Sequence, residues 1–175
     1  MSEAARRDHA GTDEVREGLI GLLPELRGFA RFLVRHPAAA DDLLHDAILR
    51  AIAAREQFQP GTNLRAWLFT ILRNTHTEQV RRRRIERRVL EEQLQSESSG
   101  APAQQSQAEL GDLGRLLWEL PTHLREAIVL VGAHGLAYEE AAEICQVPVG
   151  TMKARVSRAR AKLARAMEGK SPEQE

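Results

Sequence analysis

The sequence predicts an all-α protein made of two small helical domains that are joined by a flexible linker. Apolar residues recur at spacings of three and four in both halves of the chain, as they do on one face of a helix. No stretch shows the alternation of a half-buried strand, and a polar segment separates the two halves. We therefore expect one domain over 13–94, the linker over 95–109 and a second domain over 110–168.

Composition excludes several classes of protein. The 175 residues include 25 Lys and Arg and 25 Asp and Glu, so the chain is not a generally basic, histone-like protein. Local charge matters more for nucleic-acid binding than this sum does. The single cysteine, Cys145, excludes an intramolecular disulfide and a zinc site built from several cysteines. Because no apolar run approaches about 18 residues and the N-terminus has no apolar signal segment, we expect a cytoplasmic protein without a membrane span.

Two helices are expected at the start of the first domain, with a break at Pro37 between them. Each has apolar side chains at helical spacing, which predicts one buried face. The apolar positions of the first helix are Leu19, Leu22, Leu23, Leu26, Phe29, Ala30 and Leu33. Those of the second helix are Leu43, Leu44, Ala47, Ile48, Ala51 and Ile52.

A third helix follows the segment 58–63, whose Pro-Gly pair predicts a turn. Thr62 or Asn63 can cap this helix, because a side-chain oxygen at that position accepts a bond from a free backbone N–H. Its apolar face includes Trp67, whose spacing favours a core position over a stacking platform. The helix continues into 81–88, where six of the eight residues are arginine. This block fits phosphate binding and a solvated helix end equally well.

The linker contains the segment QSESSGAPAQQSQ at 95–107. The surrounding stretch 91–112 has five acidic residues and no Lys or Arg. It has almost no large apolar residues, so it cannot bury enough surface to order itself. In the second domain we expect a helix from about Leu113, and a second helix with Pro121 at its first position. Gly132 and Gly135 should stop that second helix.

A helix-turn-helix is expected at the end of the chain. A short helix from Tyr138 to about Cys145 leads into a turn at 146–148, and a longer basic helix begins near Val149. A helix of this kind can enter the major groove of DNA. The alternative is a solvated basic face on an ordinary bundle helix, and the preceding short helix and turn favour DNA.

The basic helix sorts into an apolar face and a DNA-facing side at about 100° per residue. The core face consists of Val149, Met152, Val156, Ala159, Leu163 and Met167. On the other side, small residues allow close approach to base edges, and Arg158 can recognise a guanine. The groove-facing candidates are Thr151, Ala154, Ser157 and Arg158, and Lys153 and Arg155 are expected to hold phosphates.

Catalysis has no support in the sequence. The six histidines are scattered and form no catalytic or metal-ligand motif. We therefore expect no enzymatic activity, no metal and no cofactor. Cys145 is expected to be a small buried residue rather than a redox switch.

Four segments together resemble the extracytoplasmic function (ECF) sigma factors, the smallest members of the bacterial sigma-70 family. They are DDLLHDAILRA at 41–51, FQPGTNLRAWLFTILRN at 58–74, LPTHLREAIVL at 120–130 and YEEAAEICQVPVGTMKARVSRARAKL at 138–163. The resemblance covers nearly the whole chain outside its ends and linker, with both family regions in the right order. It implies a transcription initiation factor that binds core RNA polymerase and promoter DNA. It also implies that the linker threads along the polymerase.

For the first domain, the resemblance implies region 2, which binds the polymerase clamp and opens the −10 promoter element. The polymerase-binding residues would be Asp42, Leu44, His45 and Asp46; the family usually has Gln-Glu-Thr where this chain has His45-Asp46-Ala47. The −10 residues would be Phe58, Gly61, Thr62, Asn63, Arg73, Asn74, Arg81 and Arg82. The loop 58–63 would capture a flipped base, which needs irregular backbone and polar groups.

For the second domain, the resemblance implies region 4, which recognises the −35 element through the major groove. The matching positions are Thr151, Lys153, Ala154, Arg155, Ser157 and Arg158. The family often has Ser where this chain has Ala154, and Ala137 stands where a Ser often caps the first helix of the motif.

Within the family, the segments look most like the general-stress-response sigma factors of alphaproteobacteria. That subgroup implies control by a small helical anti-sigma factor that covers the polymerase and DNA faces, with Leu43 and Leu44 as candidate contacts. Two alternatives stay open: a sigma-like decoy that sequesters an anti-sigma factor, and a conventional helix-turn-helix transcriptional regulator. A decoy of that kind carries a receiver domain, for which few residues remain after Met167.

Overall fold

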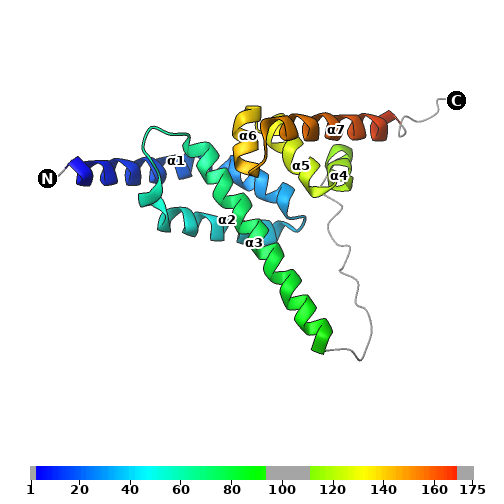
Figure 1. The fold of residues 1–175 in the computed structure, drawn as a ribbon, viewed down its shortest axis with the longest axis horizontal. Helices are drawn as coiled ribbons and strands as arrows, with labels where there is room; N and C mark the ends of the chain where they lie inside the picture. Colours follow the sequence, from blue (N-terminus) through cyan, green and yellow to red (C-terminus); the bar gives the residue numbers. More distant parts are fainter. Residues whose placement is uncertain (1–2, 94–110, 169–175) are drawn as a thin grey trace.

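The computed structural model describes the backbone of residues 3–93 and 111–168, and the side chains of 14–90 and 111–168. The described part is all helical, which confirms the predicted fold class. The expected linker at 95–109 lies outside the described residues. The first group of helices consists of α1 (Glu3–Leu33), α2 (Pro37–Ala53), the 3-10 turn η1 (Arg55–Gln57) and α3 (Leu64–Gln93) (Figure 1).

The second group contains shorter helices that surround the start of the last one (Figure 1). Its elements are α4 (Asp112–Glu119), α5 (Thr122–Ile128), η2 (Val129–Ala133), α6 (Tyr138–Cys145) and α7 (Val149–Glu168). α4 and α5 pack near α7, while α6 lies between α7 and the first group.

Helix ends follow from individual residues. Pro37 occupies the first position of α2, where its missing N–H costs nothing. Oδ1 of Asn63 accepts a hydrogen bond from the Ala66 N–H at 2.9 Å and thereby caps α3. Gln146, in the left-handed conformation with φ of 55°, ends α6 and turns the chain toward α7.

Two expectations about the second group need correction. Pro121 precedes α5 as its N-cap and is not its first residue. Gly132 does not stop the second helix, because α5 continues through a π-helical turn, η2, that contains it. The stop comes at Gly135, whose φ of 65° is in the left-handed region that glycine adopts readily.

Aromatic and aliphatic side chains fill the core of the first group. The rings of Phe29 on α1 and Phe69 on α3 lie 5.2 Å apart, and both are completely buried. Leu43 and Leu72 are equally buried between α1, α2 and α3. Ile52, which the spacing placed on the buried face of α2, is 45% exposed because that position turns outward at the end of the helix.

The two groups of helices pack against each other, and their buried side chains form one continuous apolar cluster. The imidazole of His134 from the second group lies edge-on to Phe29 and Phe69, at 6.0 and 5.1 Å between ring centroids. Nε of the buried Arg125 donates to the backbone oxygen of Phe32 at 3.0 Å. The interface is therefore both apolar and hydrogen-bonded.

The second half of α3 leaves the body of the molecule and projects from it as a single helix (Figure 1). Residues 80–90 of this projecting part are all exposed, including Val80, Ile85 and Leu90. The arginine block thus stands on a helix that has solvent around it.

Candidate nucleic-acid and polymerase interface

α7 is held in place by one apolar face. Met152, Val156 and Ala159 are completely buried, and Leu163 packs partly buried beside them. These four side chains were expected on the core face. Met167 was expected there too, but it is 57% exposed because α7 extends beyond its neighbours at that point.

The opposite side of α7 is open to solvent. Lys153, Ser157 and Arg158 are exposed, and Thr151, Ala154 and Arg155 are partly exposed. All six expected −35 residues therefore lie outside the core on one helix that follows a tight turn. Nζ of Lys153 also lies 5.7 Å from the ring centroid of Tyr138, the first residue of α6. This contact ties the two helices of the motif together.

The loop before α3 has a defined shape. The Gly61 N–H donates to the Glu14 carboxylate at 3.3 Å, and Oγ1 of Thr62 donates to the Gln59 carbonyl at 2.7 Å. Gly61 has φ of 80°, a conformation that L side chains rarely adopt. Gln59 and the residues up to Asn63 are exposed. The loop thus offers polar groups and irregular backbone on the surface.

Phe58 has a different place from the rest of the loop. It is 4% exposed, and its ring lies 5.3 Å from that of Trp67. Trp67 in turn packs against the core, as its spacing predicted. In this structure Phe58 anchors the loop from beneath and presents no ring to a ligand.

The −10 candidates on α3 fall into two environments. Asn74, Arg81 and Arg82 are exposed. Arg73 is not: its side chain is 17% exposed, and its Nε lies 3.3 Å from a carboxylate oxygen of Glu126, itself 7% exposed. This ion pair joins α3 of the first group to α5 of the second.

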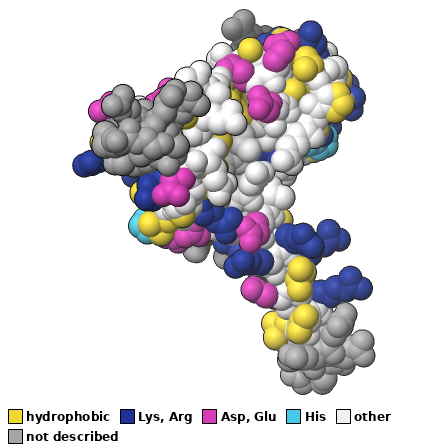
Figure 2. Space-filling view, turned by 60° about the vertical axis from the view of Figure 1, so that its left-hand side comes forward, with side chains coloured by type: hydrophobic (Ala, Val, Ile, Leu, Met, Phe, Trp, Pro, Cys, Tyr) yellow, Lys and Arg dark blue, Asp and Glu magenta, His cyan; other side chains and the backbone are white. Residues whose placement is uncertain are grey.

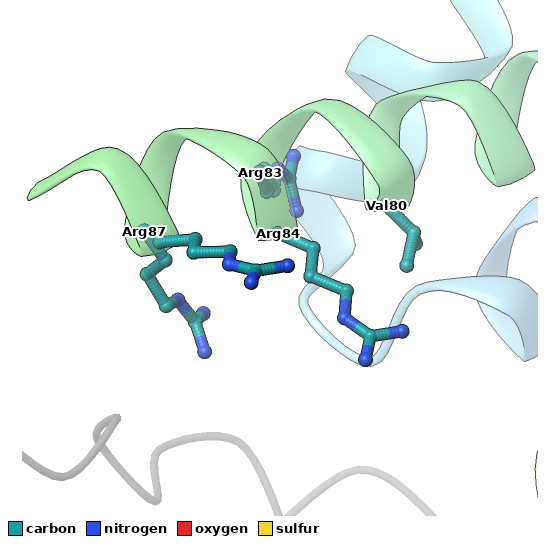
Figure 3. A pocket seen from close by; sticks show the side chains of 5 residues that line it. Val80, Arg83, Arg84 and Arg87 are labelled. Atoms are coloured by element: carbon teal, nitrogen blue, oxygen red, sulfur yellow. The ribbon is translucent and has the colours of Figure 1, made fainter. Parts of the chain in front are cut away.

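The projecting end of α3 carries a basic cavity. It is lined by Val80, Arg83, Arg84, Arg87 and Arg88, and Figure 3 shows the guanidinium groups spreading from one side of the helix. Figure 2 shows Lys and Arg side chains beside exposed hydrophobic side chains on the lower right of the molecule. A row of positive charges of this kind suits the phosphate backbone of nucleic acid. The sequence block 81–88 was the signal for it.

The expected polymerase face lies on the outer side of α2. Asp42, His45 and Asp46 are exposed, and Asp46 accepts a hydrogen bond from Nε2 of Gln79 at 2.8 Å. Leu44 is different, because it is 4% exposed and packs in the core with Leu43. Neither leucine presents its side chain to a partner in this structure.

Sequence reasoning missed an apolar surface beside these polar residues. Leu49 is 53% exposed on α2. Next to it a groove runs between α1 and α2, and arginines stand at its rim. The groove is lined by Val15, Arg16, Leu19, Ile20, Leu23, Ile48, Ile52 and Arg55. The angular position of Ile52, close to His45 on a helical wheel, was the available signal.

Further hydrogen bonds join the two groups of helices. Nδ2 of Asn63 donates to Oε1 of Glu140, and Oε2 of Glu140 accepts from the Ala137 N–H at 2.8 Å. Arg65 donates to the His134 carbonyl and pairs with Glu25. No sequence signal indicated these contacts, because the partners lie far apart along the chain.

Burial at this interface alters three pKa values. Desolvation, reinforced by Arg125, lowers the pKa of His76 to about 4, and desolvation lowers that of His134. Both imidazoles are therefore neutral near pH 7. Desolvation, together with Glu126, raises the pKa of Cys145 to about 11. The thiol is thus protonated and unreactive at neutral pH, as expected of a buried structural residue.

The described part of the chain holds neither a cluster of metal ligands nor a membrane-spanning helix. Among residues 14–90 and 111–168, no three His, Cys, Asp or Glu side chains come together as a metal site would require. None of the helices described here is both long and apolar enough to cross a membrane.

Both halves of the chain match known protein families. Sigma-70 region 2 matches residues 13–85, and Sigma-70, region 4 matches residues 110–163. The first range covers α1 to α3, with the loop and the expected polymerase face. The second range includes the helix-turn-helix. The projecting end of α3 continues past the first match.

Individual relatives agree with this assignment. The chain is 44% identical over 152 residues to EcfG, an ECF RNA polymerase sigma factor of Rhodopseudomonas palustris, covering 87% of this chain and 84% of EcfG. The solved structure of RpoE from Bartonella quintana, in complex with the anti-sigma factor NepR, superposes with a TM-score of 0.74 at 41% identity. That comparison covers 89% of this chain and 98% of RpoE.

A more distant structure has the same arrangement. CnrH, solved in complex with the cytosolic domain of CnrY, superposes with a TM-score of 0.68 at 27% identity over 96% of both chains. CnrH is an RNA polymerase sigma factor of Cupriavidus metallidurans. The chain therefore belongs to the ECF group of the sigma-70 family: it is an RNA polymerase sigma factor, a non-enzymatic initiation factor that binds core RNA polymerase and promoter DNA.

Proposed function

We propose that α7 recognises the −35 element and that the loop 58–63, with α3, captures the −10 element. The observation that carries the first half is the open side of α7, where small side chains lie between long basic ones. Thr151, Ala154, Ser157 and Arg158 face the bases, and Lys153 and Arg155 hold phosphates on either side.

The −10 assignment is supported by the loop before α3. The loop is held by bonds to Glu14 and Gln59, and Thr62 and Asn63 lie exposed on its surface. A fixed polar loop is suited to hold a base that has left the stack. The exposed Asn74, Arg81 and Arg82 continue along α3 and follow the backbone of the opened strand.

The polymerase-binding surface is the outer side of α2. Asp42, His45 and Asp46 supply its polar part. The adjacent exposed Leu49 and Ile52 give it an apolar part that sequence reasoning had not included. Leu44 supports this surface from the core.

Regulation follows the pattern of the relatives. RpoE binds the anti-sigma factor NepR, and CnrH binds CnrY. We infer that a small helical anti-sigma factor holds this chain inactive in the cytoplasm and that the chain directs transcription of stress-response genes. It has two domains, region 2 over 13–94 and region 4 over 110–168.

Reconstitution with core RNA polymerase tests the function. The purified chain should co-elute with sigma-free core polymerase in gel filtration, and the mixture should give run-off transcripts that depend on the promoter. A folded chain that does not bind core polymerase would contradict the assignment. Binding to an anti-sigma factor alone would then indicate a decoy, and binding to a palindromic duplex alone would indicate a conventional helix-turn-helix regulator.

A further inference from the structure

Two of the side chains assigned to the −10 element are already occupied inside the molecule. Arg73 is paired with Glu126 of α5, and Asn63 donates to Glu140 of α6. Both partners are carboxylates, and both come from the second group of helices. A carboxylate offers a guanidinium or an amide the same kind of charged oxygen acceptor that a phosphate or a base edge offers.

We infer that Glu126 and Glu140 close the chain on itself by occupying Arg73 and Asn63, so that this part of the −10 surface becomes fully available only when the two groups of helices separate. The inference rests on the proposed function, because that function assigns Arg73 and Asn63 to DNA. We call this pair of contacts the carboxylate clasp.

The hydrogen-bonding capacity of Asn63 makes the competition direct. Its Oδ1 is committed to the cap of α3, through the Ala66 N–H at 2.9 Å. Its Nδ2 is the remaining donor group, and that group contacts Glu140. Nδ2 carries two N–H groups, and Glu140 engages one of them, so a base edge that needs both donors can bind only after Glu140 is released.

The Arg73 side chain is likewise unavailable to DNA, because it is largely buried with its partner. Its side chain is 17% exposed and that of Glu126 is 7% exposed, so the pair is shielded by the two packed helices. A DNA phosphate that binds Arg73 has to take the place of the Glu126 carboxylate, which α5 holds there. Movement of α5 away from α3 would expose Glu126 to water and leave the Arg73 guanidinium free to bind DNA.

The clasp leaves the other DNA-binding surface open. Lys153, Ser157 and Arg158 are exposed on α7 while Arg73 and Asn63 are engaged. The closed chain therefore presents its −35 helix and withholds part of its −10 surface. This asymmetry distinguishes the clasp from general burial of the DNA-binding residues.

The closed state also contains a feature that opposes it. Within the described residues, Nε2 of His134 is buried between the groups without a hydrogen-bond partner. An unsatisfied buried polar atom destabilises the arrangement that buries it. Separation of the groups would return this nitrogen to water, so the closed state is suited to reversible opening.

Distance measurements between the groups test the inference. Spin labels at A53C on α2 and K162C on α7, in a C145A background, report the separation of two exposed positions. The variant E126Q/E140Q removes both charges of the clasp. Its matched control is E139Q/E143Q, which removes two exposed carboxylates from the same region. The single variant E140Q serves if substitution of the buried Glu126 prevents folding, as checked by circular dichroism.

The free chain should show one short distance, and E126Q/E140Q should add a broad distribution at longer distances. The control should match the unsubstituted chain. Affinity for a mixed-sequence single-stranded 20-mer should rise about tenfold in E126Q/E140Q relative to the control, if the closed form makes up about nine-tenths of the population. Affinity for a duplex of the same sequence should be equal in the two variants.

Three results would overturn the inference while leaving the function intact: an open free chain, identical distances in both double variants, or equal gains on single-stranded and duplex DNA. In each case the unsubstituted chain would still direct promoter-dependent transcription by core polymerase. Loss of that transcription in the unsubstituted chain would instead contradict the proposed function.

Discussion

Single residues decide how the two groups of helices hold together, and Arg125 shows this most clearly. It is 6% exposed, donates to the Phe32 carbonyl at 3.0 Å, and lies 3.9 Å from the ring centroid of Trp118. A buried guanidinium that is matched in this way is stabilising only as long as its partners are present. Its loss leaves the carbonyl of α1 without a donor.

Substitution of Arg125 should therefore be costly. R125M should lower the free energy of unfolding by about 2–4 kcal/mol, because it removes the bond to Phe32 and the cation–π contact with Trp118. Urea denaturation followed by circular dichroism measures this difference. The exposed Arg160 on α7 provides the control, and R160M should stay within about 0.5 kcal/mol. Equal effects of the two substitutions would contradict the interface.

The histidines make stability depend on pH. The pKa of His76 falls from 6.5 to about 4 in the folded chain because burial and nearby arginines disfavour its charged form. Below pH 6.5 the unfolded chain binds a proton that the folded chain does not, so stability is complete above that pH and falls as pH drops toward 4.

From pH 7 to pH 5 we expect a loss of about 1–2 kcal/mol from His76, after allowance for its partial exposure. Urea denaturation at both pH values measures the loss. H76Q should remove it, whereas H123Q, at an exposed position of α5, should leave it in place. The same slope in H76Q and in the unsubstituted chain would assign the pH dependence to other groups.

Arg158 and Lys153 should affect promoter binding in different ways. R158A should weaken binding of the polymerase complex to its promoter by about 1–3 kcal/mol and relax the preference at one −35 base pair. K153Q should weaken binding to all sequences alike and reduce the salt slope by about 1. Filter binding over a range of salt concentrations separates the two effects. A change of sequence preference in K153Q would reverse the assigned roles.

Residue by residue, the sequence predicted the open side of α7 because helical spacing alone separates it from the core face. The same spacing placed Leu44 on the buried face of its helix, although the family motif marked it as a contact position. The inward direction of Phe58 was not predictable, since family motifs mark positions and not side-chain directions. The partners of Arg73 and Asn63 were equally hidden, as Glu126 and Glu140 lie 53 and 77 residues away along the chain. Contacts of that separation leave no local pattern.

At the scale of the element, helix ends set the geometry of the helix-turn-helix. α6 begins after Ala137, which has the extended backbone of an N-cap residue but no side-chain oxygen. Glu140 supplies half of a capping box by accepting the Ala137 N–H at 2.8 Å. The cap is thus incomplete, as the comparison of Ala137 with the usual Ser indicated.

A137S should complete this cap. The added hydroxyl can accept from a free N–H in the first turn of α6, which should raise the free energy of unfolding by about 0.5–1.5 kcal/mol. Thermal denaturation detects the gain as a higher Tm. A161S, at an exposed position within α7, should give no gain because its N–H partners are already bonded. A gain of equal size in A161S would contradict the capping account.

Most elements were predictable because proline, glycine and apolar spacing mark them. Pro37 separates α1 from α2, Asn63 caps α3, and α7 begins at Val149 as expected. The π-helical turn at η2 was not predictable. It depends on how α5 packs against its neighbours, so Gly132 alone gave the wrong end for that helix.

For the whole molecule, the shared core explains how two small groups of helices become one folded unit. Their buried side chains form a continuous cluster, with His134 between Phe29 and Phe69. The sequence indicated two domains but carried no signal for their packing. The same interface that stabilises the free chain also covers Arg73, so stability of the closed form and access to the −10 element oppose each other.

Photocrosslinking in the polymerase complex tests the central claim most directly, namely that one chain divides promoter recognition between α7 and the loop before α3. A photoreactive group at Ser157 and another at Gln59 would each be placed in the complex with core polymerase and a promoter. We predict that position 157 crosslinks to the −35 duplex and position 59 to the opened −10 element. Crosslinks from both positions to the same element, or none to promoter DNA, would contradict the account.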